Sequence, residues 1–107
     1  MHARIDSPAL TVPGALEALQ GLGSAARKAG LPETTLSLVE LRASQINGCS
    51  VCVDMHSHEL ALAGEPQERI STIAVWREAR YFDEAERAAL ALTEAVTRLA
   101  DRPDPVA

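Results

Sequence analysis

Residues 32–48 read PETTLSLVELRASQING, a segment with the spacing of a helix and an unusually wide apolar face. Four apolar residues recur every three or four positions: Leu36, Val39, Ala43 and Ile46. Leu38 and Leu41 widen this stripe, so we expect the helix to be buried on two sides. Pro32 can start the helix, and Asn47-Gly48 can end it because both residues tolerate a positive φ.

Further helices are predicted on the C-terminal side of this segment. Residues 49–63 form the next helix, and Gly64 stands where a left-handed residue often ends one. A shorter helix follows Pro66, with inward-facing residues at Ile70, Ile73 and Val75. Residues 76–82 then form a short connector that carries every aromatic residue of the chain, as core or as the lining of a substrate pocket: Trp76, Tyr81 and Phe82.

The last predicted helix begins at Asp83, which forms a pattern like a capping box with Glu86. Five apolar residues follow at helical spacing: Ala85, Ala89, Leu92, Val96 and Leu99. Because two of the five are alanine, we expect this seam to pack closely against another helix. Near the N-terminus, Pro13 can open a helix that contains Leu16, Leu19 and Leu22, and that Gly21 and Gly23 weaken or shorten.

The composition predicts an all-α fold. The 107 residues include 19 Ala and 13 Leu but only 7 Val and 4 Ile, and the first two are strong helix formers. A core with three aromatic residues gains little from burial, and packing in an oligomer would compensate for this. We expect one domain over residues 1–107, with a flexible arm at 1–11 and a tail at 102–107.

Charge and hydropathy exclude several classes of function. The net charge of −5 disfavours nucleic-acid binding and attachment to anionic lipid. The N-terminal residues lack the apolar core of a signal peptide, and no run of about 18 apolar residues predicts a membrane span. We therefore expect a cytoplasmic protein that binds neither nucleic acid nor membrane.

The chemistry-bearing residues stand in NGCSVCVDMH, residues 47–56. On a helix, Cys49, Cys52 and His56 share one face, and the two sulfurs are close enough to form a disulfide. The cysteines follow directly on a helix start, where free N–H groups and the helix dipole stabilise a thiolate. Peroxide converts such a thiolate to sulfenic acid, and a second thiol condenses with it to a disulfide.

Three interpretations of the cysteine pair remain open at this point: redox chemistry, metal binding and inert packing. A closed zinc site needs four ligands, whereas Cys49, Cys52 and His56 supply three. A fourth ligand could come from Glu40, Glu59 or water, but nothing in the sequence specifies it. We therefore expect neither a bound metal nor a resident cofactor. His58 and Asp54 are expected on the surface, away from the shared face.

Glu40 is the candidate partner of His56. It stands among apolar neighbours, where a carboxylate is costly unless it is paired. It could orient the imidazole or relay its proton. The alternatives are an ion pair with Arg42 or Arg77, or simple exposure to solvent.

From about residue 12 to its end, the chain resembles the carboxymuconolactone decarboxylase-like family. The match is carried by SQINGC at residues 44–49, followed by Cys52 and His56, and it is closest to the alkylhydroperoxidase D branch. The resemblance implies a helical protein that forms trimers or hexamers and reduces hydroperoxides. It also implies electrons from a dithiol donor, such as dihydrolipoamide on a lipoyl carrier protein. In that scheme Cys52 attacks the peroxide, Cys49 resolves the intermediate and His56 is the matching histidine, whereas the helix-start argument favours Cys49 as the more acidic thiol.

The sequence departs from the family pattern at two relay positions. Ser37 stands where the family has a glutamate, and Val51 stands where it has a histidine. Glu40, one turn after Ser37, is the candidate replacement for the glutamate, and we expect weak peroxidase activity. The other functions considered are a general thiol–disulfide oxidoreductase and a non-enzymatic helical oligomerisation or redox-sensing module. Lactone decarboxylation is not expected, because the family's decarboxylases do not rely on this CxxC pair.

Overall fold

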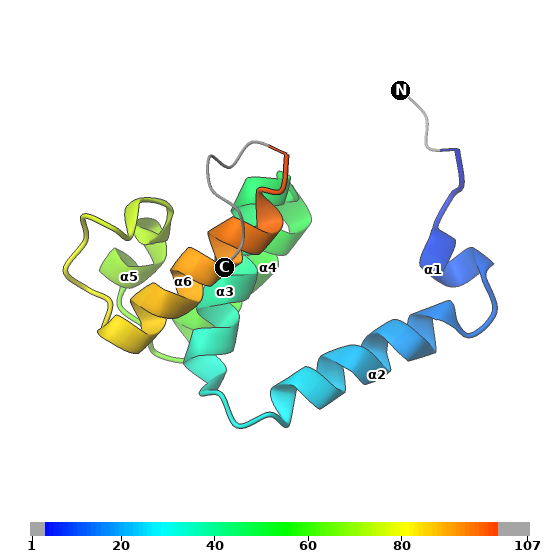
Figure 1. The fold of residues 1–107 in the computed structure, drawn as a ribbon, viewed down its shortest axis with the longest axis horizontal. Coiled ribbons are helices and arrows are strands. Elements are labelled where there is room, and N and C mark those ends of the chain that lie inside the picture. The colour runs from blue at the N-terminus through cyan, green and yellow to red at the C-terminus, as the bar shows by residue number, and fades with distance from the viewer. Residues whose placement is uncertain (1–3, 101–107) are drawn as a thin grey trace. The chain divides into compact units, whose positions relative to one another are not determined.

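The computed structural model describes residues 4–100, and every regular element in that range is a helix (Figure 1). The elements are α1 (Pro8–Thr11), α2 (Ala15–Arg27), α3 (Glu33–Asn47), α4 (Ser50–Leu62), α5 (Gln67–Ser71), the 3₁₀ helix η1 (Ile73–Val75) and α6 (Glu84–Thr97). The predicted all-α class is confirmed. The predicted tail at 102–107 lies outside the described residues.

The chain divides into two compact units between Leu31 and Pro32. In the first unit α1 packs against α2, and neither helix buries a residue. α1 lies within the segment predicted as a flexible arm. α2 continues through Gly21 and Gly23 to Arg27 as one helix, so the two glycines do not shorten it. That residues 1–107 form a single domain stays a prediction.

α3 is the centre of the second unit and packs against both α4 and α6. The core gathers buried side chains from every element of this unit: Leu38, Leu41, Leu60, Ile70, Ile73, Trp76, Phe82 and Leu90. Burying a leucine or isoleucine of this kind stabilises the fold by about 1.5–3 kcal/mol. The prediction that α3 is buried on two sides is confirmed.

The prediction that Val75 faces inward is wrong. Val75, at the end of η1, is 61% exposed, because the chain leaves the short α5 in a 3₁₀ turn instead of a continued α-helix. The apolar seam predicted to pack against another helix is largely at the surface of this chain, with Leu92 on α6 58% exposed and Leu99, just beyond the end of α6, 67% exposed, so that packing stays a prediction. The face of α6 turned to α3 instead carries Leu90 and three polar residues: Glu86, Thr93 and Glu94.

Buried ion pairs explain why polar residues occupy that face. Glu94 accepts hydrogen bonds from Arg42 Nε on α3, at 2.9 Å, and from the indole Nε1 of Trp76, at 3.3 Å. Arg77 also donates to Glu94 and lies over the Trp76 ring, 4.3 Å from its centroid. Burial raises the pKa of Glu94, but the hydrogen bonds from Arg77 and Arg42 outweigh it, so this pKa lies below its ordinary value. We call Arg42, Trp76, Arg77 and Glu94 the Glu94 cluster.

Arginines also fix the connector between η1 and α6. Arg87 donates to the backbone carbonyl oxygens of three connector residues: Trp76, Arg77 and Ala79. Arg69 on α5 binds Glu65 and Glu86, and the hydrogen bond to Glu86 raises the pKa of Arg69 above its ordinary value. The predicted capping box is confirmed, since Asp83 and Glu86 each accept the other's backbone N–H. Of the three aromatic residues in the connector, Trp76 and Phe82 belong to the buried core, whereas Tyr81 is 39% exposed.

Candidate functional site

A tight turn delivers the first cysteine to the start of α4. Gly48 has φ +72°, a conformation that favours glycine, and its N–H donates to the Gln45 carbonyl at 3.2 Å. The N–H of Cys49 donates to the Ser44 carbonyl at 3.0 Å. These two bonds form a Schellman motif, which closes α3 and leaves Cys49 as the N-cap of α4.

The two cysteines are brought together by this helix start. Cys49 and Cys52 are joined by a disulfide, with their Cα atoms 5.3 Å apart. The Cys49 sulfur also accepts the backbone N–H of Cys52 at 3.2 Å. A backbone N–H donor and the positive end of a helix dipole are the groups that stabilise a thiolate at a helix start. The geometry thus allows the reversible dithiol–disulfide chemistry that the spacing predicted.

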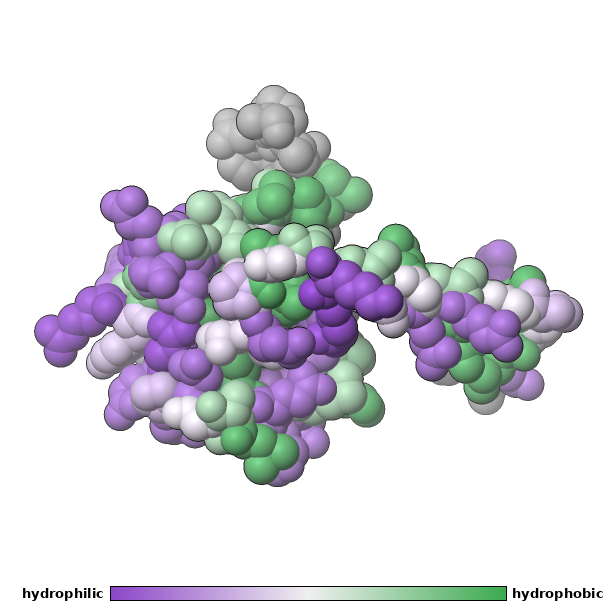
Figure 2. All heavy atoms as spheres, turned by 90° about the horizontal axis from the view of Figure 1, so that it is seen from below, coloured by the Kyte–Doolittle hydropathy of each residue, from purple (hydrophilic) through white to green (hydrophobic). Residues whose placement is uncertain are grey.

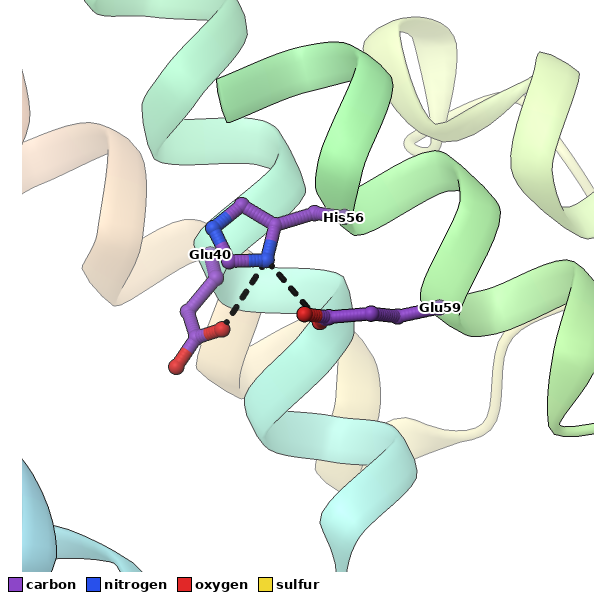
Figure 3. Close-up of side chains that lie close together, drawn as sticks. All are labelled: Glu40, His56 and Glu59. Atoms are coloured by element: carbon purple, nitrogen blue, oxygen red, sulfur yellow. Dashed lines mark hydrogen bonds and ion pairs between the residues drawn. The ribbon is translucent and has the colours of Figure 1, made fainter. Parts of the chain in front are cut away.

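His56 lies one helical turn beyond Cys52 and faces two carboxylates (Figure 3). Its Nδ1 is 3.1 Å from Oε2 of Glu40 on α3 and 3.1 Å from Oε2 of Glu59 on α4. The imidazole is largely buried, with 13% of its side chain exposed. One ring nitrogen is therefore held between two helices by acidic groups.

Glu40 lies beside His56, the position that a role in orienting the imidazole requires. Its side chain is 31% exposed, but Oε2, the oxygen that faces His56, is shielded from solvent. The alternative partners considered from the sequence, Arg42 and Arg77, bind Glu94 instead. The structure thus brings Glu40 to His56, as one of the sequence hypotheses required.

Glu59 is the site residue whose place sequence reasoning missed. It was considered there only as an unspecified fourth metal ligand. On α4 it stands three residues after His56, and this spacing puts two helical side chains side by side. The signal was therefore present in the sequence, as a histidine followed three residues later by a glutamate.

The remaining candidates lie as expected or depart from the family pattern. Asp54 and His58 are exposed on α4, as predicted. Val51, at the position of the family's second relay histidine, is 75% exposed and offers no titratable group. Ser37 lies on α3 one turn before Glu40.

The described part of the chain, residues 4–100, contains no helix with both the length and the apolar character needed to cross a lipid bilayer.

Comparison with known proteins gives a consistent grouping. The family model described as "Carboxymuconolactone decarboxylase family" matches residues 13–95. The protein YdfG of Bacillus subtilis is 30% identical over 93 residues, which are 87% of this chain and 63% of YdfG. The alkyl hydroperoxide reductase AhpD of Methylocella silvestris is 41% identical over 66 residues, which are 62% of this chain and 34% of AhpD. The chain thus spans less than two thirds of the length of both curated relatives.

A solved structure extends the comparison to the fold. The crystal structure of ATU0492 from Agrobacterium tumefaciens superposes with a TM-score of 0.81 at 38% sequence identity. The superposition covers 97% of this chain and 70% of that one. ATU0492 is a protein of unknown function for which a role in antioxidant defence, as an AhpD, has been suggested.

Proposed function

Since the chain belongs to the carboxymuconolactone decarboxylase family, in its alkylhydroperoxidase D-like branch, we propose that it is a thiol-dependent hydroperoxide reductase. The observation that carries the proposal is the Cys49–Cys52 disulfide at the start of α4, with His56 one turn further along the same helix. A dithiol at a helix N-terminus is suited to react with peroxide and then to form a disulfide.

The proposed cycle needs one peroxide and one external dithiol. A cysteine thiolate attacks a peroxide oxygen; an S–O bond forms, the O–O bond breaks, and the alcohol leaves after taking a proton. The second thiol then attacks the sulfenic sulfur, forming the S–S bond and releasing water. The external dithiol reduces this disulfide by two exchange steps and becomes a disulfide itself. Two electrons thus pass from the donor to the peroxide.

His56 is the proposed proton carrier of the cycle, and Glu40 is the residue that positions it. An imidazole can take the thiol proton and return it to the leaving alkoxide. The carboxylate of Glu40, 3.1 Å from Nδ1, orients the ring and stabilises it when it carries the proton. In this scheme Glu40 acts through His56, without contact with the peroxide.

Either cysteine could supply the thiol that attacks the peroxide. The family resemblance assigns the attack to Cys52 and the resolving step to Cys49. The hydrogen bond from the Cys52 N–H to the Cys49 sulfur favours Cys49 as the thiolate. The two single Cys→Ser variants decide between them, because only the variant that keeps the attacking thiol forms a sulfenic acid.

The partners of the reaction follow from the same proposal. We propose a hydroperoxide as substrate and a dithiol, such as dihydrolipoamide on a lipoyl carrier protein, as electron donor. We further propose that the chain acts in the cytoplasm as a homo-oligomer, a trimer or a hexamer.

A thiol count tests the proposed function directly. The reduced protein is freed of reductant, mixed with one equivalent of an organic hydroperoxide, and followed by free-thiol assay and intact mass. We expect rapid loss of both thiols and a mass decrease of about 2 Da, the two hydrogens lost on disulfide formation. Either Cys49→Ser or Cys52→Ser should abolish turnover with a dithiol donor. Thiols that persist for minutes, or full turnover in both variants, would refute the proposal.

One observation favours a second candidate, a thiol–disulfide oxidoreductase. Ser37 and Val51 replace two relay residues of the family, and disulfide exchange needs only the cysteine pair. Rates with a disulfide substrate, measured beside rates with peroxide, separate the two functions.

A further inference from the structure

Three side chains outside the disulfide converge on one point. Nδ1 of His56 and one carboxylate oxygen each from Glu40 and Glu59 all lie within 4.8 Å of one another (Figure 3). We propose that these three residues form a binding site for a divalent cation of the zinc type, separate from the cysteine pair. The sequence had directed attention to Cys49, Cys52 and His56 as ligands, and the structure assembles a different set.

The number of acidic groups around one nitrogen supports a cation. Nδ1 of a histidine carries at most one hydrogen, so it can donate one good hydrogen bond. Here two carboxylate oxygens stand at the same distance, 3.1 Å, from that atom. A divalent cation at the point of convergence would accept a lone pair from all three groups at once, and its charge would offset both carboxylates.

The spacing of the donor atoms suits tetrahedral coordination. Zinc binds nitrogen and oxygen at about 2.0–2.2 Å, which places neighbouring ligand atoms about 3.3 Å apart. Both separations between Nδ1 and a carboxylate oxygen, 3.1 Å, are close to this value, and the two carboxylate oxygens lie within 4.8 Å of each other.

The burial of the ligands suits a site that is closed on one side and open on the other. Oε2 of Glu40 is shielded from solvent, and the imidazole is 13% exposed. Glu59 is 46% exposed and forms the open wall. Three protein ligands and an open side leave a fourth place for water, as in zinc sites that exchange a ligand.

The donor types select the cation. Magnesium and calcium prefer shells of oxygen alone, whereas an imidazole with carboxylates suits zinc. None of the three donors is sulfur, so this site is distinct from a metal site built on the Cys49 and Cys52 thiolates.

Zinc at this site would also regulate the proposed reaction. It would occupy Nδ1 of His56 and the carboxylate of Glu40, so Glu40 could no longer orient the imidazole directly for the proton transfer assigned to His56. This consequence rests on the proposed peroxidase function, whereas the binding site itself does not.

The test is calorimetric titration of the oxidised protein with zinc, because disulfide sulfurs do not compete for the metal. We expect one zinc per chain. Glu59→Gln should weaken binding at least about tenfold, and His56→Gln should abolish it. Asp54→Asn and His58→Gln are controls, because they remove an exposed carboxylate and an exposed imidazole from the same helix, and they should bind zinc as the parent does.

A second protein separates this site from the thiols. The double variant Cys49→Ser, Cys52→Ser keeps a good N-cap residue at the start of α4 and carries no sulfur ligand there. It should bind zinc as tightly as the oxidised parent. The proposal is overturned if the oxidised parent binds no zinc at micromolar concentration, if Glu59→Gln or His56→Gln binds undiminished, or if zinc binds only when both thiols are present and reduced. None of these readouts uses peroxidase activity, so a failed peroxide assay leaves them interpretable.

Discussion

Ser37 and Glu40 lie three residues apart on α3, and side chains at this spacing share one face of a helix. A glutamate at the second position can therefore extend from the same face of α3 as one at the first. The 3.1 Å contact between Glu40 and His56 shows that the carboxylate reaches the imidazole from there. The departure from the family pattern at Ser37 thus leaves the histidine with an acidic partner from α3.

Replacing Glu40 by glutamine should slow peroxide-driven disulfide formation by about tenfold to a hundredfold, because the neutral amide no longer stabilises a protonated imidazole. The rate is measured by stopped-flow thiol loss at several pH values. Glu40→Gln should alter the shape of the pH–rate profile, and Glu40→Asp should restore part of the rate. Glu68→Gln, at an exposed position on α5, serves as control. An unchanged profile in Glu40→Gln would leave the carboxylate with a structural role only.

The sequence was sufficient to name Cys49, Cys52, His56 and Glu40, because spacing on a helix is a local property. It could not choose between His56 and an arginine as the partner of Glu40. That choice depends on Glu94, which lies 52 residues from Arg42 along the chain and forms the ion pair with it. Pairing across such a distance follows from how α6 packs on α3, which no local pattern encodes.

The Glu94 cluster joins α3 to α6. Arg42 is the inner partner, with 12% of its side chain exposed, whereas Arg77 is 61% exposed. An ion pair that is screened by water contributes little, and one that is shielded leaves a costly charge behind when its partner is removed.

Arg42→Met should therefore destabilise the protein by about 2–3 kcal/mol, and Arg77→Met by less than about 1 kcal/mol. Urea denaturation followed by circular dichroism measures both. The dependence of the unfolding free energy on pH, on the acidic side, gives a second readout. Because the pKa of Glu94 is lowered in the folded state, its contribution is complete above its ordinary value of 4.5 and is lost as pH falls through the lower folded value. This acid-induced loss should be smaller in Arg42→Met. Equal effects of the two substitutions would contradict the assignment of Arg42 as the inner partner.

The element boundaries were predictable where capping residues mark them. Gly48, Gly64 and the Asp83–Glu86 pair end or begin helices as expected. The inward face of α6 was not predictable, because Glu86 and Glu94 are buried there in ion pairs with arginines from other elements. Prediction from hydrophobic periodicity assumes that charged residues are exposed. This assumption fails where a charged residue is buried in an ion pair.

Large apolar side chains remain at the surface of one copy of the protein. Figure 2 shows hydrophobic side chains on several parts of the face that it presents. Exposed large apolar residues include Leu92 and Val96 on α6, Leu99 just beyond its end, and Leu16, Leu19 and Leu22 on α2. Exposed apolar faces at helical spacing are typical of surfaces that associate. They are consistent with the proposed homo-oligomer.

The double substitution Leu92→Glu, Val96→Glu should shift the protein to a monomer, since it places two charges on the exposed seam of α6. Light scattering coupled to size-exclusion chromatography measures the mass of the particle. Leu62→Glu, at an exposed position on α4, is the control and should leave the mass unchanged. An unaltered oligomer in the double variant would place the interface elsewhere.

The turn at Gly48 has a consequence for how the protein folds. It makes α3 and α4 a helical hairpin, and Glu40, both cysteines, His56 and Glu59 all belong to that hairpin. Contacts between residues near in sequence lose little chain entropy when they form, and topologies rich in them fold fast. The thiols and their acidic partners thus meet through short-range contacts, whereas α6 docks on α3 through long-range contacts. We expect a chain still being synthesised to bring its redox residues together once this hairpin closes.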